Sequence, residues 1–234
     1  MKTQNPRPQS PNHSARKIST SRGKTAGNRS HPLSSLAVSL LSASALLASV
    51  QSGQAVSATW AASASGNWNA GGNWSTGSAP GLGGTGANST DTATFNLNNT
   101  GVTTVSVDTS RDIGNITFDT DASSYTFSGG PLWLTVGAKI QMTAAMTGHN
   151  VTEKFTAPIT LWDGGGQTFT NNSTDATNIF QFGSVNASQN NGLVLNGSNT
   201  GNNAINGAIT SSVGNLTVTK DGTGTWALTG SNTY

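Results

Sequence analysis

The sequence of 234 residues contains no cysteine, which excludes disulfide bonds and thiolate metal ligands. Charge is scarce as well, since Asp, Glu, Lys and Arg together make up 9% of the chain. Disorder driven by high charge and low hydropathy is therefore not expected. A compact helical fold is not expected either, because the many Gly and Thr residues are poor helix formers. These absences leave a polar β structure.

Acidic residues are absent from the first 90 positions, and Asp91 is the first of them. Seven of the eleven basic residues lie within the first 29 positions, so the sequence pI near 9.2 belongs to the N-terminal leader. From residue 59 onward there are four basic and nine acidic residues, a net charge of −5. A basic pI normally points to nucleic acid as a partner. Here the charge distribution excludes that interpretation.

Residues 33–50 form the single long apolar run, and it follows the basic start of the chain. Small residues come next, in Gly53-Gln54-Ala55 and in Val56-Ser57-Ala58. A basic, then apolar, then small-x-small order is typical of a secretory signal peptide. A transmembrane anchor is the alternative, but six serines within the run disfavour it. We therefore predict a signal peptide at 1–58, with a basic region at 1–32, an apolar core at 33–50 and cleavage near Ala55 or Ala58.

Short β-rich runs bounded by Gly, Asn, Asp or Ser follow the leader, and none of them has helical periodicity. This density of brief strands and turns predicts an all-β sandwich, barrel or solenoid. The runs that indicate strands are 91–97, 102–107, 115–118, 124–127, 132–136, 139–142, 167–170, 178–182, 192–195, 204–209, 215–218 and 225–229.

Internal similarity favours the solenoid among these options. The segment 195–200 (LNGSNT) recurs almost unchanged as 228–233 (LTGSNT), 33 positions later. The segments 115–118 and 125–129 are echoed by 215–218 and 226–230. Repeats of this period predict stacked units. We expect an all-β, right-handed parallel β-helix, with an N-terminal cap at 59–97 and coils at 98–234, in which Asn and Thr ladders join the turns and Gly occupies the corners.

The last 20 residues, 215–234, resemble the autotransporter-associated β-strand repeat. Besides Lys220, the matching positions are Gly222, Gly224, Thr225, Leu228, Gly230, Asn232, Thr233 and Tyr234. Trp226 departs from the family, which has an aliphatic residue there. The resemblance implies a truncated member of a family of secreted passenger regions, exported to the outer-membrane surface or the exterior of a Gram-negative-type bacterium.

Three tryptophans, Trp60, Trp68 and Trp74, lie in a Gly-, Asn- and Ser-rich segment. Exposed indoles stack on sugar rings, so these residues are candidates for a carbohydrate-binding surface. The alternative is that they cover the apolar end of the first coil, because solenoids need such caps. The cap is the favoured interpretation.

The best catalytic candidate is Arg111 with the acidic residues around it, Asp108, Asp112, Asp119 and Asp121. Polysaccharide lyases with a β-helix fold combine acidic calcium ligands with a basic proton acceptor. The alternative is that these aspartates are turn residues. His149 has no partner at metal-ligand spacing. We therefore predict no catalytic site, cofactor or metal.

These observations predict an exported structural or adhesive protein whose stacked coils act mechanically. Its expected partners are the secretion machinery, through the signal peptide, and a host or matrix surface or glycans. Neither nucleic acid nor, after cleavage, a place within the membrane is expected. A carbohydrate-binding or lyase-like β-helix protein is the alternative.

Overall fold

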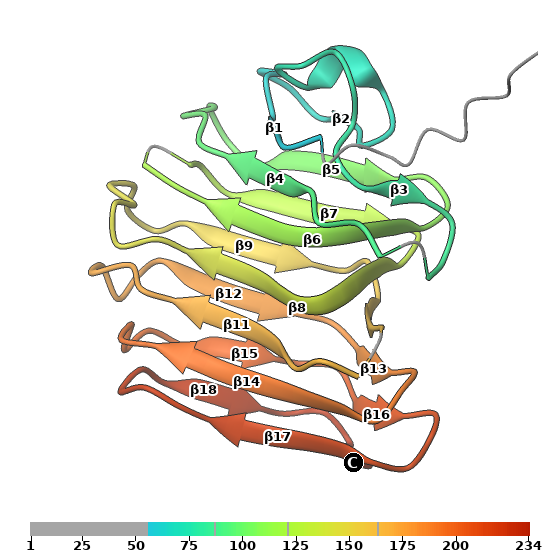
Figure 1. Cartoon of the computed structure of the whole chain (residues 1–234). Helices are drawn as coiled ribbons and strands as arrows, with labels where there is room; N and C mark the ends of the chain where they lie inside the picture. Colours follow the sequence, from blue (N-terminus) through green and yellow to red (C-terminus); the bar gives the residue numbers. More distant parts are fainter. Residues whose placement is uncertain (1–55, 87, 121, 163) are drawn as a thin grey trace, which may run out of the picture. The chain divides into compact units, whose positions relative to one another are not determined.

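The computed structural model describes residues 56–86, 88–120, 122–162 and 164–234. The predicted signal segment up to Ala55 lies outside the described residues. The described chain is all-β, and its one helix is the single 3-10 turn η1 (Gly71–Asn73). The strands run nearly parallel to one another in successive layers from β4 to β18 (Figure 1). This arrangement is the predicted parallel β-helix, or β-solenoid.

Each coil contributes strands to three faces, and every strand pairs in parallel with its equivalents in the coils above and below. The first face contains β4 (Thr92–Phe95), the second half of β6 (Arg111–Phe118), the second half of β8 (Leu132–Met142), β11 (Gln167–Asn171), β14 (Asn191–Gly197) and β17 (Leu216–Lys220). The second face contains β2 (Gly66–Asn67), β5 (Thr103–Val107), β7 (Tyr125–Gly129), β9 (Thr152–Phe155), β12 (Ile179–Phe182), β15 (Asn203–Ile205) and β18 (Trp226–Leu228). The third face contains the first halves of β6 and β8, then β10 (Ile159–Leu161), β13 (Val185–Ala187) and β16 (Ile209–Ser211).

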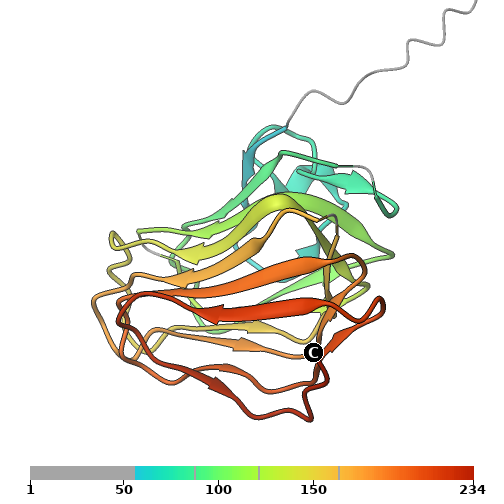
Figure 2. The same ribbon diagram turned by 60° about the horizontal axis from the view of Figure 1, so that its bottom comes forward.

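Two short strands precede this regular stack. β1 (Ala58–Thr59) pairs in parallel with β4, whereas β3 (Leu82–Gly83) pairs antiparallel with the start of β6. The antiparallel strand adds to the edge of the third face, beside the first half of β6. Seen from the end that carries β17 and β18, the later coils lie over one another (Figure 2).

Side-chain alternation along each strand builds the core. Odd positions of β5, for example, are buried while even positions are half-buried, as a pleated strand requires. Residues in register form columns through the coils, and Phe127, Phe155 and Phe182 make one of them. Their rings stack with centroid distances of 4.5 and 4.8 Å. Each coil therefore packs mainly on its two neighbours, as in other solenoids.

The length of a coil differs from the repeat seen in the sequence. From β4 onward, paired Cα positions in adjacent coils are 21 to 29 residues apart. The 33-residue repeat is thus longer than one coil. Its two copies lie on different faces, because Leu195 pairs with Lys220 on the first face and Leu228 with Ile205 on the second. The looser similarity does join equivalent positions of the solenoid. The segments 115–118 and 216–218 lie on the first face, and β7 and β18 lie on the second.

Candidate functional site

The three candidate sugar-stacking tryptophans lie in the core at the N-terminal end of the solenoid. Trp60 and Trp68 are fully buried, and Trp74 is 2% exposed. Their rings surround Phe95, with centroid distances of 6.0, 6.1 and 5.7 Å for Trp60, Trp68 and Trp74. The indole of Trp68 donates to the carbonyl of Pro80 at 2.9 Å. A carbohydrate-stacking role for Trp60, Trp68 and Trp74 is therefore wrong for this structure, because no ring face reaches solvent. They close the apolar end instead.

Arg111, the centre of the candidate lyase cluster, has a structural role. Its side chain is 7% exposed and donates at 3.0 Å to the carbonyl of Gly81, which holds the segment before β3 against β6. A second nitrogen donates to Asn69 Oδ1. Burial lowers the pKa of Arg111, and the nearby charges of Asp108, Asp112 and Asp91 oppose that shift.

Only part of the candidate acidic cluster lies near Arg111, namely Asp108 and Asp112. Asp112 is fully buried beneath β3, while Asp108 is exposed. Asp119 follows the opposite end of β6 and accepts a hydrogen bond from Thr143 in the next coil. Asp121 lies outside the described residues. The expected calcium and proton-acceptor arrangement is therefore not assembled in the described part of the chain.

The glycines of the repeat-like segment lie where adjacent coils approach closely. A Cβ atom on Gly224 would lie 2.5 Å from the carbonyl oxygen of Asn199, and one on Gly230 would lie 2.1 Å from that of Gly207. Gly222 also has a positive φ of 66°. Side chains are excluded at all three positions by neighbouring backbone or by conformation. The motif thus places glycines at the contacts between the last coils.

The other motif residues bind the neighbouring coil. The amide of Thr225 donates to Asn199 at 2.9 Å, and that of Thr233 donates to Ile209 at 2.9 Å. Asn232 Oδ1 accepts the amide of Ile209 at the same distance. Leu228 is half-buried over Ile205, and Tyr234 is half exposed. Lys220 caps the turn that follows β17 by donating to the carbonyls of Asp221 and Gly222.

A buried asparagine network lies between the first and second faces, in the loops that join them. Asn203 is fully buried and donates to Asn199 Oδ1 and to the carbonyl of Thr225, each at 3.1 Å. Its Oδ1 accepts from Asn171 at 2.7 Å and from the amide of Phe180 at 3.0 Å. This network confirms the predicted asparagine bonding between coils. The particular residues were not identified from the sequence, where they look like ordinary turn residues.

Glu153, the single glutamate of the chain, was also missed. It points into the core from β9 and is fully buried. Its Oε2 accepts the amide of Tyr125 at 3.0 Å, while Oε1 has no hydrogen-bond partner among the described residues. Desolvation raises the pKa of Glu153 well above its ordinary value, although the bond from Tyr125 opposes the rise. Burial therefore disfavours the charged form of Glu153 in the folded core.

Two further tryptophans lie on the outer side of the third face. Trp133 of β8 and Trp162, which follows β10, are half-buried with ring centroids 5.0 Å apart. The segment after β3 crosses them closely, because a Cβ atom on Gly86 would lie 2.8 Å from the Trp162 ring. Their ring faces therefore serve largely to hold this segment against the solenoid.

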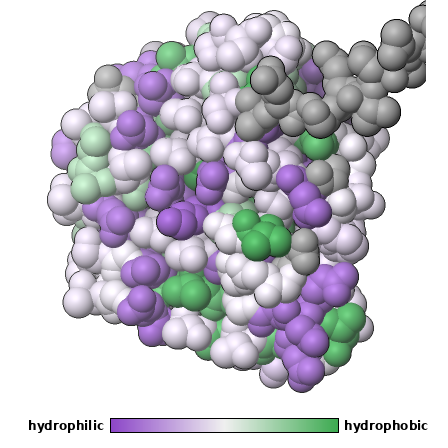
Figure 3. All heavy atoms as spheres, viewed as in Figure 1, coloured by the Kyte–Doolittle hydropathy of each residue, from purple (hydrophilic) through white to green (hydrophobic). Residues whose placement is uncertain are grey.

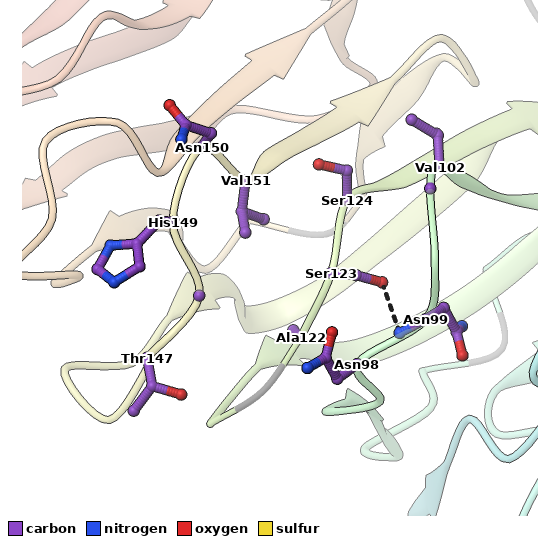
Figure 4. A pocket seen from close by; sticks show the side chains of 12 residues that line it. Asn98, Asn99, Val102, Ala122, Ser123, Ser124, Thr147, His149, Asn150 and Val151 are labelled. Carbon is purple, nitrogen blue, oxygen red and sulfur yellow. Dashed lines mark hydrogen bonds between the residues drawn. The ribbon is translucent and has the colours of Figure 1, made fainter.

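A groove of about 580 Å³ lies where the loops between the first and second faces project outward. Three successive coils line it, through 98–102, 122–124 and 147–151, and Figure 4 shows these loops side by side. Ala122 and Val151 form its buried apolar part, at 1% and 4% exposure. Polar lining comes from Asn, Ser and Thr side chains, and the described lining contains no Asp, Glu, Lys or Arg. Its size is within the range of small-molecule sites.

The groove retains hydrogen-bonding capacity. Asn99 Nδ2 donates to Thr103 Oγ1 at 3.0 Å, which leaves Asn99 Oδ1 to accept from a ligand. The side chain of Asn98 is exposed. Ser123 Oγ accepts the amide of Asn99 at 3.3 Å (Figure 4), and its hydroxyl also hydrogen-bonds to Tyr125. The ring of His149 points away from these residues. It pairs with Asp175 of the next coil, and together with Thr177 it lowers the pKa of Asp175 to about 2.

In the described part of the chain, no group of three or more His, Cys, Asp or Glu residues is placed to hold a metal ion. Nor does any helix among those residues have the length and apolar character to cross a membrane.

The geometry defines the class of this protein as a β-solenoid. The chain matches no protein-family model, no curated protein and no solved structure. The resemblance of 215–234 to the autotransporter-associated repeat therefore stays a prediction from the sequence.

Proposed function

We propose that this chain is an exported structural and adhesive β-helix of the passenger type, presented outside a Gram-negative-type bacterium, and that it acts without a catalytic site. The proposal rests on the contacts that residues of the solenoid make between coils and with the N-terminal segment. Asn203, Arg111 and Gly224 join coil to coil or fix the N-terminal segment. These three residues are thus committed to the scaffold.

The solenoid suits folding after export. Because each coil pairs only with its neighbours, coils can be added progressively without a source of chemical energy. Buried amide networks replace the disulfides that a cysteine-free exported protein lacks. The face seen in Figure 3 is also mixed, with small apolar areas dispersed among polar ones. Such a surface presents many weak contacts, as an adhesive protein requires.

Export is tested with the full chain carrying a C-terminal tag in a Gram-negative host. We expect the tag outside the cytoplasm and, in intact cells, increased retention on glass coated with extracellular-matrix extract. A Leu40→Arg/Leu46→Arg double variant interrupts the apolar core and should keep the protein inside, whereas Leu40→Ile/Leu46→Ile should not. Cytoplasmic accumulation of the unaltered chain would contradict the proposal.

The groove favours a second candidate function, the binding of a neutral oligosaccharide. Its lining combines apolar Ala122 and Val151 with amide and hydroxyl groups, which matches the apolar and hydroxyl-bearing surfaces of sugars. The described lining contains no Lys or Arg to pair with an anionic ligand, and His149 already pairs with Asp175. Successive coils are spaced by about 4.8 Å, a step comparable to one sugar ring.

Saturation-transfer NMR of the exported protein with neutral cello-, xylo-, manno- and malto-oligosaccharides tests this second function. We expect Asn98→Ala and Asn150→Gly to weaken binding at least tenfold, and glycine keeps the positive φ of 58° at residue 150. Asn202→Ala is the matched control, because Asn202 is exposed on a later turn outside the groove. Equal binding by all variants, or none by the unaltered protein, would reject a saccharide site here.

A further inference from the structure

The amide nitrogen of Val56 makes a partly buried contact at the start of the described chain. It donates to Asp91 Oδ1 at 2.7 Å. The other carboxylate oxygen accepts the amide of Gly81, also at 2.7 Å, and Asp91 is 4% exposed. Both described donors are neutral amides. A buried carboxylate thus faces the backbone nitrogen of Val56 without a charged hydrogen-bond donor from the described residues.

Residues 56–58 also belong to the fold. The amide of Thr92 donates to Ser57 Oγ at 3.2 Å. Ala58 is 5% exposed and pairs with Ala93 in the ladder between β1 and β4. Cleavage after Ala58 would remove all three residues and every one of these contacts. Cleavage after Ala55, at the end of Gly53-Gln54-Ala55, would remove none of them.

We propose that the signal peptide is cleaved between Ala55 and Val56, and that the new N-terminal ammonium of Val56 forms an ion pair with buried Asp91. This inference rests on the proposed export. A signal peptidase of the secretion machinery supplies the reaction, in which water adds to the carbonyl carbon of Ala55 and the bond to the Val56 nitrogen breaks. Ala55 leaves as a carboxylate, and the amine of Val56 takes up a proton.

Cleavage at this bond changes the Val56 nitrogen from a neutral amide donor into a charged ammonium donor, and the Asp91 carboxylate is already positioned to accept from it. Hydrogen bonds between an ammonium and a carboxylate are shorter and stronger than those between neutral groups. Asp91 is held in place by Gly81, and its own amide donates to Ser89 Oγ at 3.1 Å. Processing would therefore strengthen the closure of the N-terminal end only when it occurs at this bond.

The first test is the N-terminal sequence and intact mass of the exported product of the full chain. We expect Val56 as the first residue. An exported product that begins at Thr59, or at any other residue, would overturn this inference and leave the proposed export standing. Failure of the chain to leave the cytoplasm would overturn both.

The second test measures the ion pair by pulse acylation of the exported protein, with mass spectrometry of its N-terminal peptide. We expect the amine of Val56 to react at least tenfold more slowly at pH 7 than in Asp91→Asn, with Asp108→Asn unchanged because Asp108 is exposed. In the unaltered protein, the midpoint of reactivity should lie above the ordinary α-amine range of about 7.7–8.0. An ordinary midpoint, with equal rates in all proteins, would overturn the ion pair even if Asp91→Asn folds poorly.

Discussion

Replacing Glu153 by glutamine should stabilise the solenoid at neutral pH and remove part of its dependence on pH. Glu153 occupies a core column between Tyr125 and Phe180, because the register of the second face places these residues over one another. Burial raises its pKa in the folded state, whereas the unfolded chain has the ordinary value of about 4.3. Glutamine keeps a carbonyl acceptor for the amide of Tyr125 and carries no ionisable group.

The sign follows from the proton balance. Below about pH 4, Glu153 is protonated in both the folded and the unfolded chain, so its ionisation does not change the free energy of unfolding. Between the unfolded and the raised folded pKa, the unfolded chain loses the proton and the folded chain keeps it. The free energy of unfolding then falls by about 1.4 kcal/mol for each pH unit. At pH 7, Glu153→Gln should therefore be more stable than the unaltered protein, by an amount that grows with pH until the folded carboxyl ionises.

Urea unfolding followed by tryptophan fluorescence from pH 4.5 to 8 measures the effect. The difference between Glu153→Gln and the unaltered protein isolates this group, because other carboxyls contribute equally to both. Asp108→Asn, which removes an exposed carboxyl, is the control and should give a flat difference. If the curves for Glu153→Gln and the unaltered protein run parallel across this range, Glu153 is hydrated and the reasoning is refuted.

Three other substitutions test the packing between coils and at the N-terminal end. Gly224→Ala should lower the free energy of unfolding by about 2 kcal/mol or more, through its clash with the neighbouring backbone. Gly72→Ala, with no heavy atom within 4 Å of the added Cβ, should have little effect in the same urea titration. Asn203→Ala should cost about 2–4 kcal/mol, because it leaves buried partners without hydrogen bonds, whereas exposed Asn202→Ala should be near neutral by thermal denaturation. Trp68→Ala should cost about 3–5 kcal/mol in calorimetry, and a loss near zero would mean that this indole does not close the core.

Most strands of the fold were predictable from local sequence, but β9, β10 and β13 match none of the predicted runs, and the run 204–209 covers parts of two strands, β15 and β16. The run 102–107 corresponds to β5 (Thr103–Val107), and the run 167–170 to β11. The runs 132–136 and 139–142 were expected as separate strands but form one bent strand, β8, with Gly137 at a positive φ of 66°. Alternation and turn residues are local signals, so they locate strands well. They do not show whether a glycine ends a strand or bends it.

Features that depend on which coil lies over which were not predictable. Nothing near Arg111 in the sequence distinguishes a buried side chain from an exposed one, because aspartates lie on both sides of it. The groove is likewise invisible in the sequence, since its lining comes from three separate loops. For the same reason, the 33-residue spacing of the repeat differs from the length of one coil. Similar turn motifs recur at different faces, so their spacing does not equal one circuit of the chain.

The buried asparagines explain how this register is chosen. Apolar columns alone tolerate a slip of two residues, because side chains alternate with a period of two and the same face remains inward. After such a slip, Asn203 would lose its partners in Asn171, Phe180 and Thr225, which lie in neighbouring coils. Each buried amide left without a partner costs about 1–3 kcal/mol. We infer that the asparagine network rejects misaligned coils, so that the polar composition of the chain selects one stacking while the apolar columns stabilise it.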